Sequence, residues 1–239
     1  TTGAGNVTIT GNIDSNTTTV THNGAGTLTL SGTNAYTGAT TVTAGTLAFS
    51  SIGNVAGGSS ALGAPATVAA GTINLGAATL RYTGSGHSSD RVINLTAPGT
   101  IDASGTGALT LLSGIPAATA TNLTLTGAGS ASIAAIATSG GVTKLGAGTW
   151  TLSGVNSYSG ATLINEGTLE YSGGTQALAG SLTFGSLPAS TNACNLVLTS
   201  SALTFGGAFL VQTNTVANTI SIGNGSNLTF KNSVTIGYD

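Results

Sequence analysis

Hydrophobic and polar residues alternate along this chain in many short runs. In Thr27-Leu28-Thr29-Leu30 every second side chain is large and apolar, and Thr46-Leu47-Ala48-Phe49 repeats the pattern. A period of two is typical of a β-strand with one buried face. A related signature, Gly then Thr or Ser then apolar-x-apolar, returns at 71–75 and 180–184 and more weakly at 107–111. No window of useful length has the 3.6-residue period of an amphipathic helix, so the pattern predicts an all-β chain.

A duplication organises these predicted strands. Residues 24–50 (the first copy) return as residues 146–172 (the second copy), and 17 of the 27 aligned positions are identical. A unit repeated so closely is usually a stacking unit of a solenoid, because its apolar face needs a neighbour to cover it. Positions that keep large apolar side chains are expected to face inward; this predicted repeat core is Leu28, Leu30, Val42, Leu47, Phe49, Trp150, Leu152, Ile164, Leu169 and Tyr171. Positions that vary freely are expected to face water; they are Thr43 and Asn165, Ala44 and Glu166, and Ala48 and Glu170.

Corners are expected between the strands of each copy, where Gly and Asn allow left-handed backbone angles. The predicted corner residues are Gly32, Asn34, Tyr36 and Gly38 in the first copy, and Gly154, Asn156, Tyr158 and Gly160 in the second. We expect each tyrosine ring to lie over its turn, with the hydroxyl reaching solvent or a backbone group. Alternatively, the pair would form a flat platform on which sugars stack.

At these residues the sequence resembles the autotransporter-associated β-strand repeat, also called the passenger-associated transport repeat. The family pattern is met in the second copy by Lys144, Gly146, Gly148, Thr149, Leu152, Gly154, Asn156, Tyr158, Gly167 and Leu169. The first copy matches through the equivalent residues, with Thr21 where the lysine would be. The resemblance covers only these two segments. It implies a right-handed parallel β-helix from a secreted or surface-displayed protein.

The weaker signatures predict that degenerate coils fill the space between the two copies. If each coil takes about 20 to 25 residues, the chain forms roughly ten coils of one solenoid domain spanning residues 1–239. Three stretches interrupt the alternation with Gly, Ser, Pro or charged residues. We interpret 53–65, 83–91 and 115–121 as surface excursions.

Composition supports this class and excludes others. With 38 Gly and only ten charged residues, the chain has little from which to build exposed helices. A net charge of −2 and four widely spaced cations argue against nucleic-acid binding, and no apolar run predicts a membrane-spanning segment. So few titratable groups also predict little change in stability between pH 4 and 9. Cys194 has no partner for an intrachain disulfide and is expected to be a small buried hydrophobe.

Candidate chemistry is sparse. Glu166 and Glu170 are expected to be too far apart along an extended strand to act as a glycosidase pair. His87, Asp90 and Arg91 form the densest polar cluster, which we interpret as a salt-bridged surface loop. His22 has no second histidine nearby, as a metal site would require. The sequence therefore predicts no catalytic residues, no cofactor-binding residues and no metal site.

Three classes of function remain open. The first is a structural, extracellular or cell-surface β-solenoid that is not an enzyme, serving as a fibre subunit or a passenger stalk. An adhesin that binds surface glycans is the second, and a polysaccharide-degrading enzyme is the third. Strand-like sequence near both ends of the chain, at 6–10 and 228–236, predicts that the chain associates head-to-tail with itself.

Overall fold

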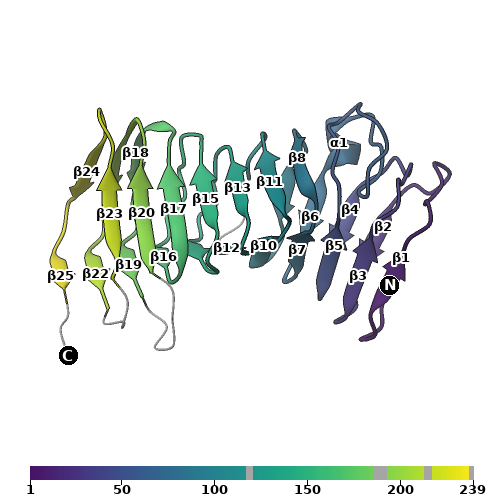
Figure 1. Ribbon diagram of the computed structural model, residues 1–239, viewed down its shortest axis with the longest axis horizontal. Helices are drawn as coiled ribbons and strands as arrows, with labels where there is room; N and C mark the ends of the chain where they lie inside the picture. Colours follow the sequence, from purple (N-terminus) through teal and green to yellow (C-terminus); the bar gives the residue numbers. More distant parts are fainter. Residues whose placement is uncertain (117–120, 186–192, 213–216, 237–239) are drawn as a thin grey trace.

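In a computed structural model, the chain winds into a stack of short parallel strands (Figure 1). The structure describes residues 1–116, 121–185, 193–212 and 217–236. One sheet, here called the long sheet, runs the length of the stack. Its eleven strands are β1 (Val7–Ile9), β3 (Thr27–Leu30), β5 (Thr46–Phe49), β7 (Thr79–Tyr82), β10 (Gly99–Ala103), β12 (Leu123–Thr126), β14 (Val142–Lys144), β16 (Thr162–Ile164), β19 (Leu182–Phe184), β22 (Phe209–Val211) and β25 (Val234–Ile236).

A seven-stranded sheet forms the second side of the stack. It contains β8 (Ser85–Ser89), β11 (Gly107–Leu111), β13 (Ser130–Ile133), β15 (Thr149–Leu152), β17 (Gly167–Tyr171), β20 (Cys194–Leu198) and β23 (Thr219–Ile222). Each strand of two smaller sheets directly precedes a strand of the long sheet in chain order, so these two sheets together make a third side. The first has β2 (Val20–His22), β4 (Thr40–Val42), β6 (Ile73–Leu75) and β9 (Ile93–Leu95), and the other has β18 (Gly174–Leu178), β21 (Ser201–Phe205) and β24 (Asn227–Phe230).

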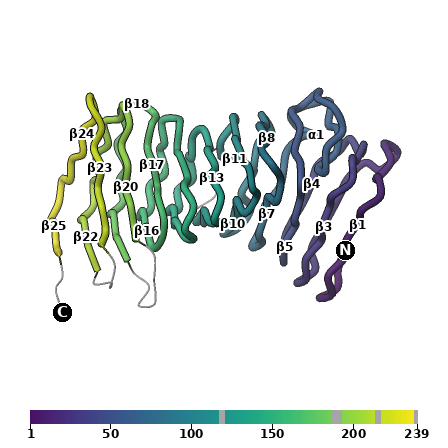
Figure 2. The backbone as a smooth tube through the Cα atoms, viewed as in Figure 1, coloured from purple at the N-terminus to yellow at the C-terminus, as the bar shows by residue number. Residues whose placement is uncertain are grey.

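Most coils of this stack take about the number of residues that the repeats predict, and the coil from Thr46 to Thr79, with 33 residues, is the longest of the long sheet. Leu123 lies opposite Val142, which lies opposite Thr162, so the coils there take 19 and 20 residues. The eleven strands of the long sheet confirm an all-β solenoid of about ten turns. Figure 2 shows the backbone advancing coil by coil along one axis.

Neighbouring strands are parallel and in register, so the inward side chains of successive coils stack into continuous columns. One inward column of the long sheet consists of Val7, Leu28, Leu47, Leu80, Ile101, Leu125, Lys144, Ile164, Phe184, Val211 and Ile236. Each fully buried Leu, Ile or Phe in such a column stabilises the fold by about 1.5–3 kcal/mol. The core is therefore a narrow apolar strip along the axis, in which one lysine replaces an aliphatic residue.

The predicted excursions have different outcomes. The predicted excursion 53–65 lies within residues 50–72, which join β5 to β6 and contain a short helix, α1 (Val68–Gly71). Ala61 and Leu62 within it are nevertheless fully buried. The interpretation of 83–91 as an excursion is wrong, because 85–89 form β8, which pairs with β11. In the third stretch Ile115 is buried and bridges to Ile136, while residues 117–120 lie outside the described residues.

Candidate functional site

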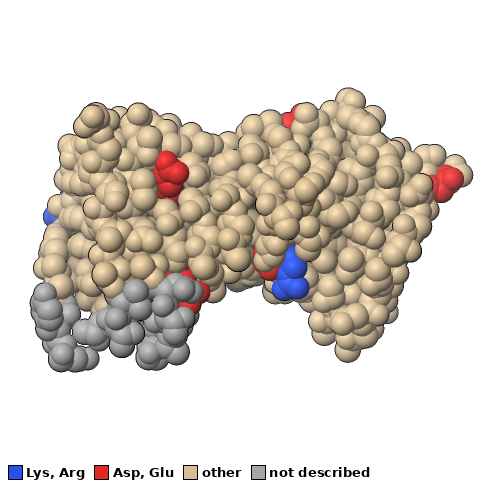
Figure 3. Space-filling model, viewed as in Figure 1, with Lys and Arg blue, Asp and Glu red and all other residues tan. Residues whose placement is uncertain are grey.

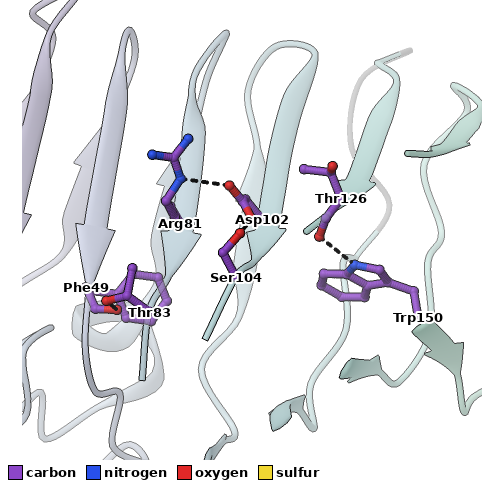
Figure 4. Close-up of polar contacts among 7 residues, drawn as sticks. All are labelled: Phe49, Arg81, Thr83, Asp102, Ser104, Thr126 and Trp150. Carbon is purple, nitrogen blue, oxygen red and sulfur yellow. Dashed lines mark hydrogen bonds and ion pairs between the residues drawn. The ribbon is translucent and has the colours of Figure 1, made fainter. Parts of the chain in front are cut away.

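The two copies of the repeat are the part of this chain with the clearest sequence signal. All ten residues of the predicted repeat core are buried, and the most exposed of them, Leu28, has 2% of its surface accessible. Trp150 is fully buried, and its indole Nε1 donates to the carbonyl of Thr126 at 2.9 Å (Figure 4). Here the repeat supplies the largest side chain of the core.

The two copies occupy different sides of the solenoid. In the first copy β3 and β5 lie in the long sheet and β4 on the third side. In the second copy the equivalent strands, β15 and β17, lie in the seven-stranded sheet and β16 in the long sheet. Relative to the first copy, the strands of the second copy are therefore displaced by one side of the three-sided solenoid. The repeat sequence specifies a coil and does not specify which side each strand joins.

Four corner glycines are required by close packing between coils, and the expectation of left-handed angles there is wrong. Gly32, Gly38, Gly154 and Gly160 are not among the glycines with positive φ. A Cβ at Gly38 would lie 1.5 Å from the carbonyl oxygen of Thr18, and one at Gly160 would lie 2.4 Å from a backbone nitrogen of the previous coil. Left-handed angles occur instead at Gly45 (φ 64°) and its equivalent Gly167 (φ 69°), and at Gly146 (φ 67°), the first residue of the second copy.

The corner asparagines join one coil to the next. Asn34 Oδ1 accepts from the backbone N–H of Ile13 at 2.8 Å, and Asn156 Oδ1 accepts from that of Ile136 at 2.9 Å. Both asparagines are at most 2% exposed. Asn156 Nδ2 also donates to Gln176 Oε1 at 2.8 Å. In these strandless corners, the carboxamides satisfy backbone groups that a β-ladder would otherwise pair.

The corner tyrosines point into the core, so the expectation that their hydroxyls reach solvent or a backbone group is wrong. Tyr36 and Tyr158 are 0% and 1% exposed. The Tyr36 hydroxyl pairs with Thr40 Oγ1 at 2.8 Å, and that of Tyr158 pairs with Thr162 Oγ1 at 2.6 Å and with the Tyr171 hydroxyl. Burial raises the pKa of Tyr158 and raises that of Tyr171 to about 12. Neither ring is available to stack on a sugar.

Lys144, named above only as a residue of the family pattern, is a buried cation. Its Nζ donates to the carbonyl oxygens of Leu145 (2.7 Å), Gly146 (2.6 Å) and Glu166 (3.0 Å), which use all three of its protons. Burial lowers the pKa of Lys144 to about 8, and the negative charge of Glu166 opposes that change. The sequence did contain a signal for this burial. In Val142-Thr143-Lys144, the alternation that buries Val142 also places the side chain of Lys144 inward.

The first copy has a histidine at the position of Lys144. Aligning Gly24 with Gly146 places His22 there, not Thr21. His22 is 1% exposed, and its Nε2 lies 3.0 Å from the carbonyl oxygen of Gly26, to which it donates. Both copies therefore direct a side-chain N–H at carbonyls of the turn that precedes a core strand.

The cluster of His87, Asp90 and Arg91 is not a salt-bridged surface loop. Arg91 is 1% exposed; its Nε donates to the carbonyl of Gly71 at 2.6 Å, and its Nη1 donates to that of Leu62. These bonds fasten the 50–72 excursion onto the stack. Asp90 Oδ1 accepts from the backbone N–H of Val55 at 2.7 Å, while His87 Nδ1 contacts the Tyr82 hydroxyl at 2.7 Å. The prediction failed because Asp90 and Arg91 are satisfied by residues distant in sequence.

Two of the positions expected to face water are buried. Ala48 is 6% exposed because it lies between Thr29 and Arg81 of adjacent strands, and Asn165 is 2% exposed in the tight turn before β17. Glu170 is half-buried; its carboxylate accepts from Thr151 at 3.0 Å and Thr199 at 2.8 Å, on the coils before and after. The described partners of this carboxylate are hydroxyls of neighbouring coils.

Cys194, as expected, is buried, and burial raises the pKa of its thiol.

Charged side chains are few on the face of the molecule in Figure 3. Hydroxyl groups instead line part of the outer surface. One outward column of the long sheet consists of Thr27, Thr46, Thr79, Thr100, Thr124, Thr143, Leu163, Thr183, Leu210 and Thr235. Beside it, Arg81 Nε donates to Asp102 Oδ2 at 2.7 Å (Figure 4).

Within the described ranges, no three His, Cys, Asp or Glu side chains are grouped closely enough to hold a metal ion. No helix in the described parts of the chain is long and apolar enough to cross a bilayer.

Comparison with known proteins agrees with this geometry. The model of the passenger-associated-transport-repeat family matches residues 20–49 and 142–170, which contain most of the two copies. No curated protein and no solved structure matches the chain. The repeats and the solenoid fit a passenger-like structural protein, and the repeat family implies a surface or secreted location. The chain thus carries two passenger-associated transport repeats on a β-solenoid like that of an autotransporter passenger.

Proposed function

We propose that this chain is a stiff spacer rod of an extracellular, surface-displayed passenger protein, with a structural rather than a catalytic role. The observation that carries this proposal is the long sheet, whose eleven strands continue through every coil. At about 4.8 Å per strand, its ten steps span roughly 50 Å. Each coil packs against the coils before and after it over its whole cross-section. Bending the rod would separate these packed core side chains, so we expect the rod to be stiff.

The polar groups of the chain support this role over the alternatives. Lys144, Arg91 and Asn156 are occupied by hydrogen bonds within or between coils. The aromatic pair that favoured an adhesin, Tyr36 and Tyr158, is buried. Among the described residues, the outward threonine column is a polar surface that a glycan could contact. The other partner we propose is a second copy of this chain.

A display experiment tests the spacer role. The chain is placed between an outer-membrane anchor and an epitope tag, and antibody binding to intact cells is compared with total expression. We expect the tag to be exposed for the natural chain and for Ala44→Glu, but lost for Leu152→Asp, which puts an unpaired carboxylate in the core. Equal exposure of the tag in all three would contradict a role that depends on the folded rod.

A further inference from the structure

The outer face of the seven-stranded sheet carries a polar patch around Glu170. Glu170 lies opposite Val197 of the next strand, and two positions earlier Thr168 lies opposite Asn195. All four side chains are half-buried and alternate with buried core residues, so they point outward. Neighbouring strands are about 4.8 Å apart and alternate residues of one strand about 6.6 Å apart, so the four side chains frame an area comparable to one monosaccharide. We call this area the Glu170 patch.

Hydrogen bonds hold the two strongest polar groups of the patch in place. The Glu170 carboxylate accepts from Thr151 Oγ1 at 3.0 Å and from Thr199 Oγ1 at 2.8 Å. Asn195 Oδ1 accepts from the Thr219 hydroxyl, and its Nδ2 donates within the patch at 3.4 Å. A carboxylate can accept about four hydrogen bonds, and a carboxamide nitrogen can donate two. Both groups therefore keep capacity for a ligand after their bonds to the described residues are made.

The first copy of the repeat builds the same strands without this patch. Ala48 is the equivalent of Glu170, and Arg81 lies opposite it where Val197 lies opposite Glu170. β3 and β5 nevertheless pair in the same register as β15 and β17. The coil therefore forms without a carboxylate at this position, and Glu170 is an addition that the fold itself does not require.

We propose that the Glu170 patch binds a neutral sugar residue. Two adjacent hydroxyls of the sugar donate to the Glu170 carboxylate, in charge-assisted hydrogen bonds that are stronger than neutral ones. The Asn195 carboxamide bonds a further hydroxyl, and the C–H groups of the sugar ring pack on Val197. Small-molecule sites combine apolar contact with a few placed polar groups in this way.

The charge of this face selects against acidic sugars. In Figure 3 the acidic side chain over β17 has no Lys or Arg beside it. A sugar carboxylate placed there would meet a negative charge without a compensating cation, and such like-charge contacts oppose binding. This sugar site goes beyond the spacer role and does not depend on it.

Retention on sugar-bearing beads tests the proposal. The full chain is passed over beads that carry D-mannose, D-galactose or D-glucose, and over beads that carry D-glucuronate. We expect retention on at least one of the neutral sugars, release by the same free sugar, and no retention on glucuronate. Glu170→Ala should lower retention by at least about tenfold, because it removes the hydrogen bonds to a charged acceptor. Asn195→Ala should lower retention as well.

Glu166→Ala is the matched control. Both glutamate substitutions introduce the alanine that the first copy already has, and Glu166 lies in the turn before β17, outside the patch. Circular dichroism and melting midpoints confirm that each variant is folded. The proposal would be overturned by a lack of retention on every neutral sugar, by undiminished retention of Glu170→Ala, or by equal retention on glucuronate. Display of the epitope tag tests the spacer role separately, because it does not depend on sugar binding.

Discussion

The ammonium of Lys144 and the α-carbon of Gly167 share one small space in the core. A Cβ built on Gly167 would lie 2.7 Å from Lys144 Nζ, and 2.4 Å from the carbonyl oxygen of Gly146. Gly167 also has a φ of 69°, which side-chain-bearing residues rarely adopt. The glycine of the second copy thus leaves room for the lysine that fills the turn.

We therefore expect Gly167→Ala to destabilise the fold by at least about 2 kcal/mol, through backbone strain and overpacking. Chemical denaturation measures the loss. Gly58→Ala is the matched control, since a Cβ at Gly58 meets nothing within 4 Å. Equal midpoints for the two variants would contradict the close contact.

The pKa of Lys144 predicts a pH dependence that departs from the expectation, drawn from the small number of titratable groups, of little change in stability up to about pH 9. Its folded value of about 8 is below the ordinary 10.5, so between these values the unfolded chain binds more protons than the folded one. Stability should therefore rise from pH 8 toward pH 10, by up to about 3 kcal/mol if complete. The raised pKa of Tyr171, about 12, has the opposite sign and lowers stability above pH 10.

Denaturation midpoints at about pH 7.5, 9, 10 and 11 test this dependence. The rise should disappear in Lys144→Met, while Tyr171→Phe should keep the rise and lessen the later fall. A midpoint that falls steadily from pH 8 would show that the ammonium, with its three carbonyl partners, is favoured in the folded state.

The corner asparagines give a third prediction. Asn156→Ala leaves the buried N–H of Ile136 without its acceptor, which costs about 1–3 kcal/mol. Asn12 makes the same type of bond to the N–H of Thr33 at an exposed site, where water replaces it. Asn12→Ala should therefore cost less than about 1 kcal/mol. If thermal or chemical unfolding showed equal losses of stability for Asn156→Ala and Asn12→Ala, burial would not explain the importance of Asn156.

Inward and outward positions should respond in opposite ways to charge. Leu30→Asp and Leu152→Asp bury an unpaired carboxylate and should prevent folding, because that penalty is several kcal/mol. Ala44→Glu should fold normally, because the second copy already has Glu166 at that position. Circular dichroism and soluble yield distinguish the variants, and a folded Leu152→Asp chain would contradict the inward columns.

Sequence pattern predicted the inward and outward alternation well, because a period of two leaves each strand only one way to bury Leu28 or Leu152. It did not predict which side of the solenoid each copy occupies, since nothing local distinguishes three similar sides. Arg91 and β8 were missed for a different reason. Arg91 is buried through bonds to Leu62 and Gly71, far away in sequence, and no local pattern records those partners. In β8 only Ser89 is buried, so this strand lacks the alternating apolar residues that mark the others.

Continuous columns along one axis are the central claim, and a distance across several coils tests it most directly. Thr27 and Thr143 lie in one outward column, five strands apart. Spin labels on Thr27→Cys and Thr143→Cys, in a Cys194→Ala background, should give a narrow distance distribution centred near about 24 Å by pulsed electron paramagnetic resonance. A broad distribution, or one centred beyond about 40 Å, would contradict the stacked solenoid.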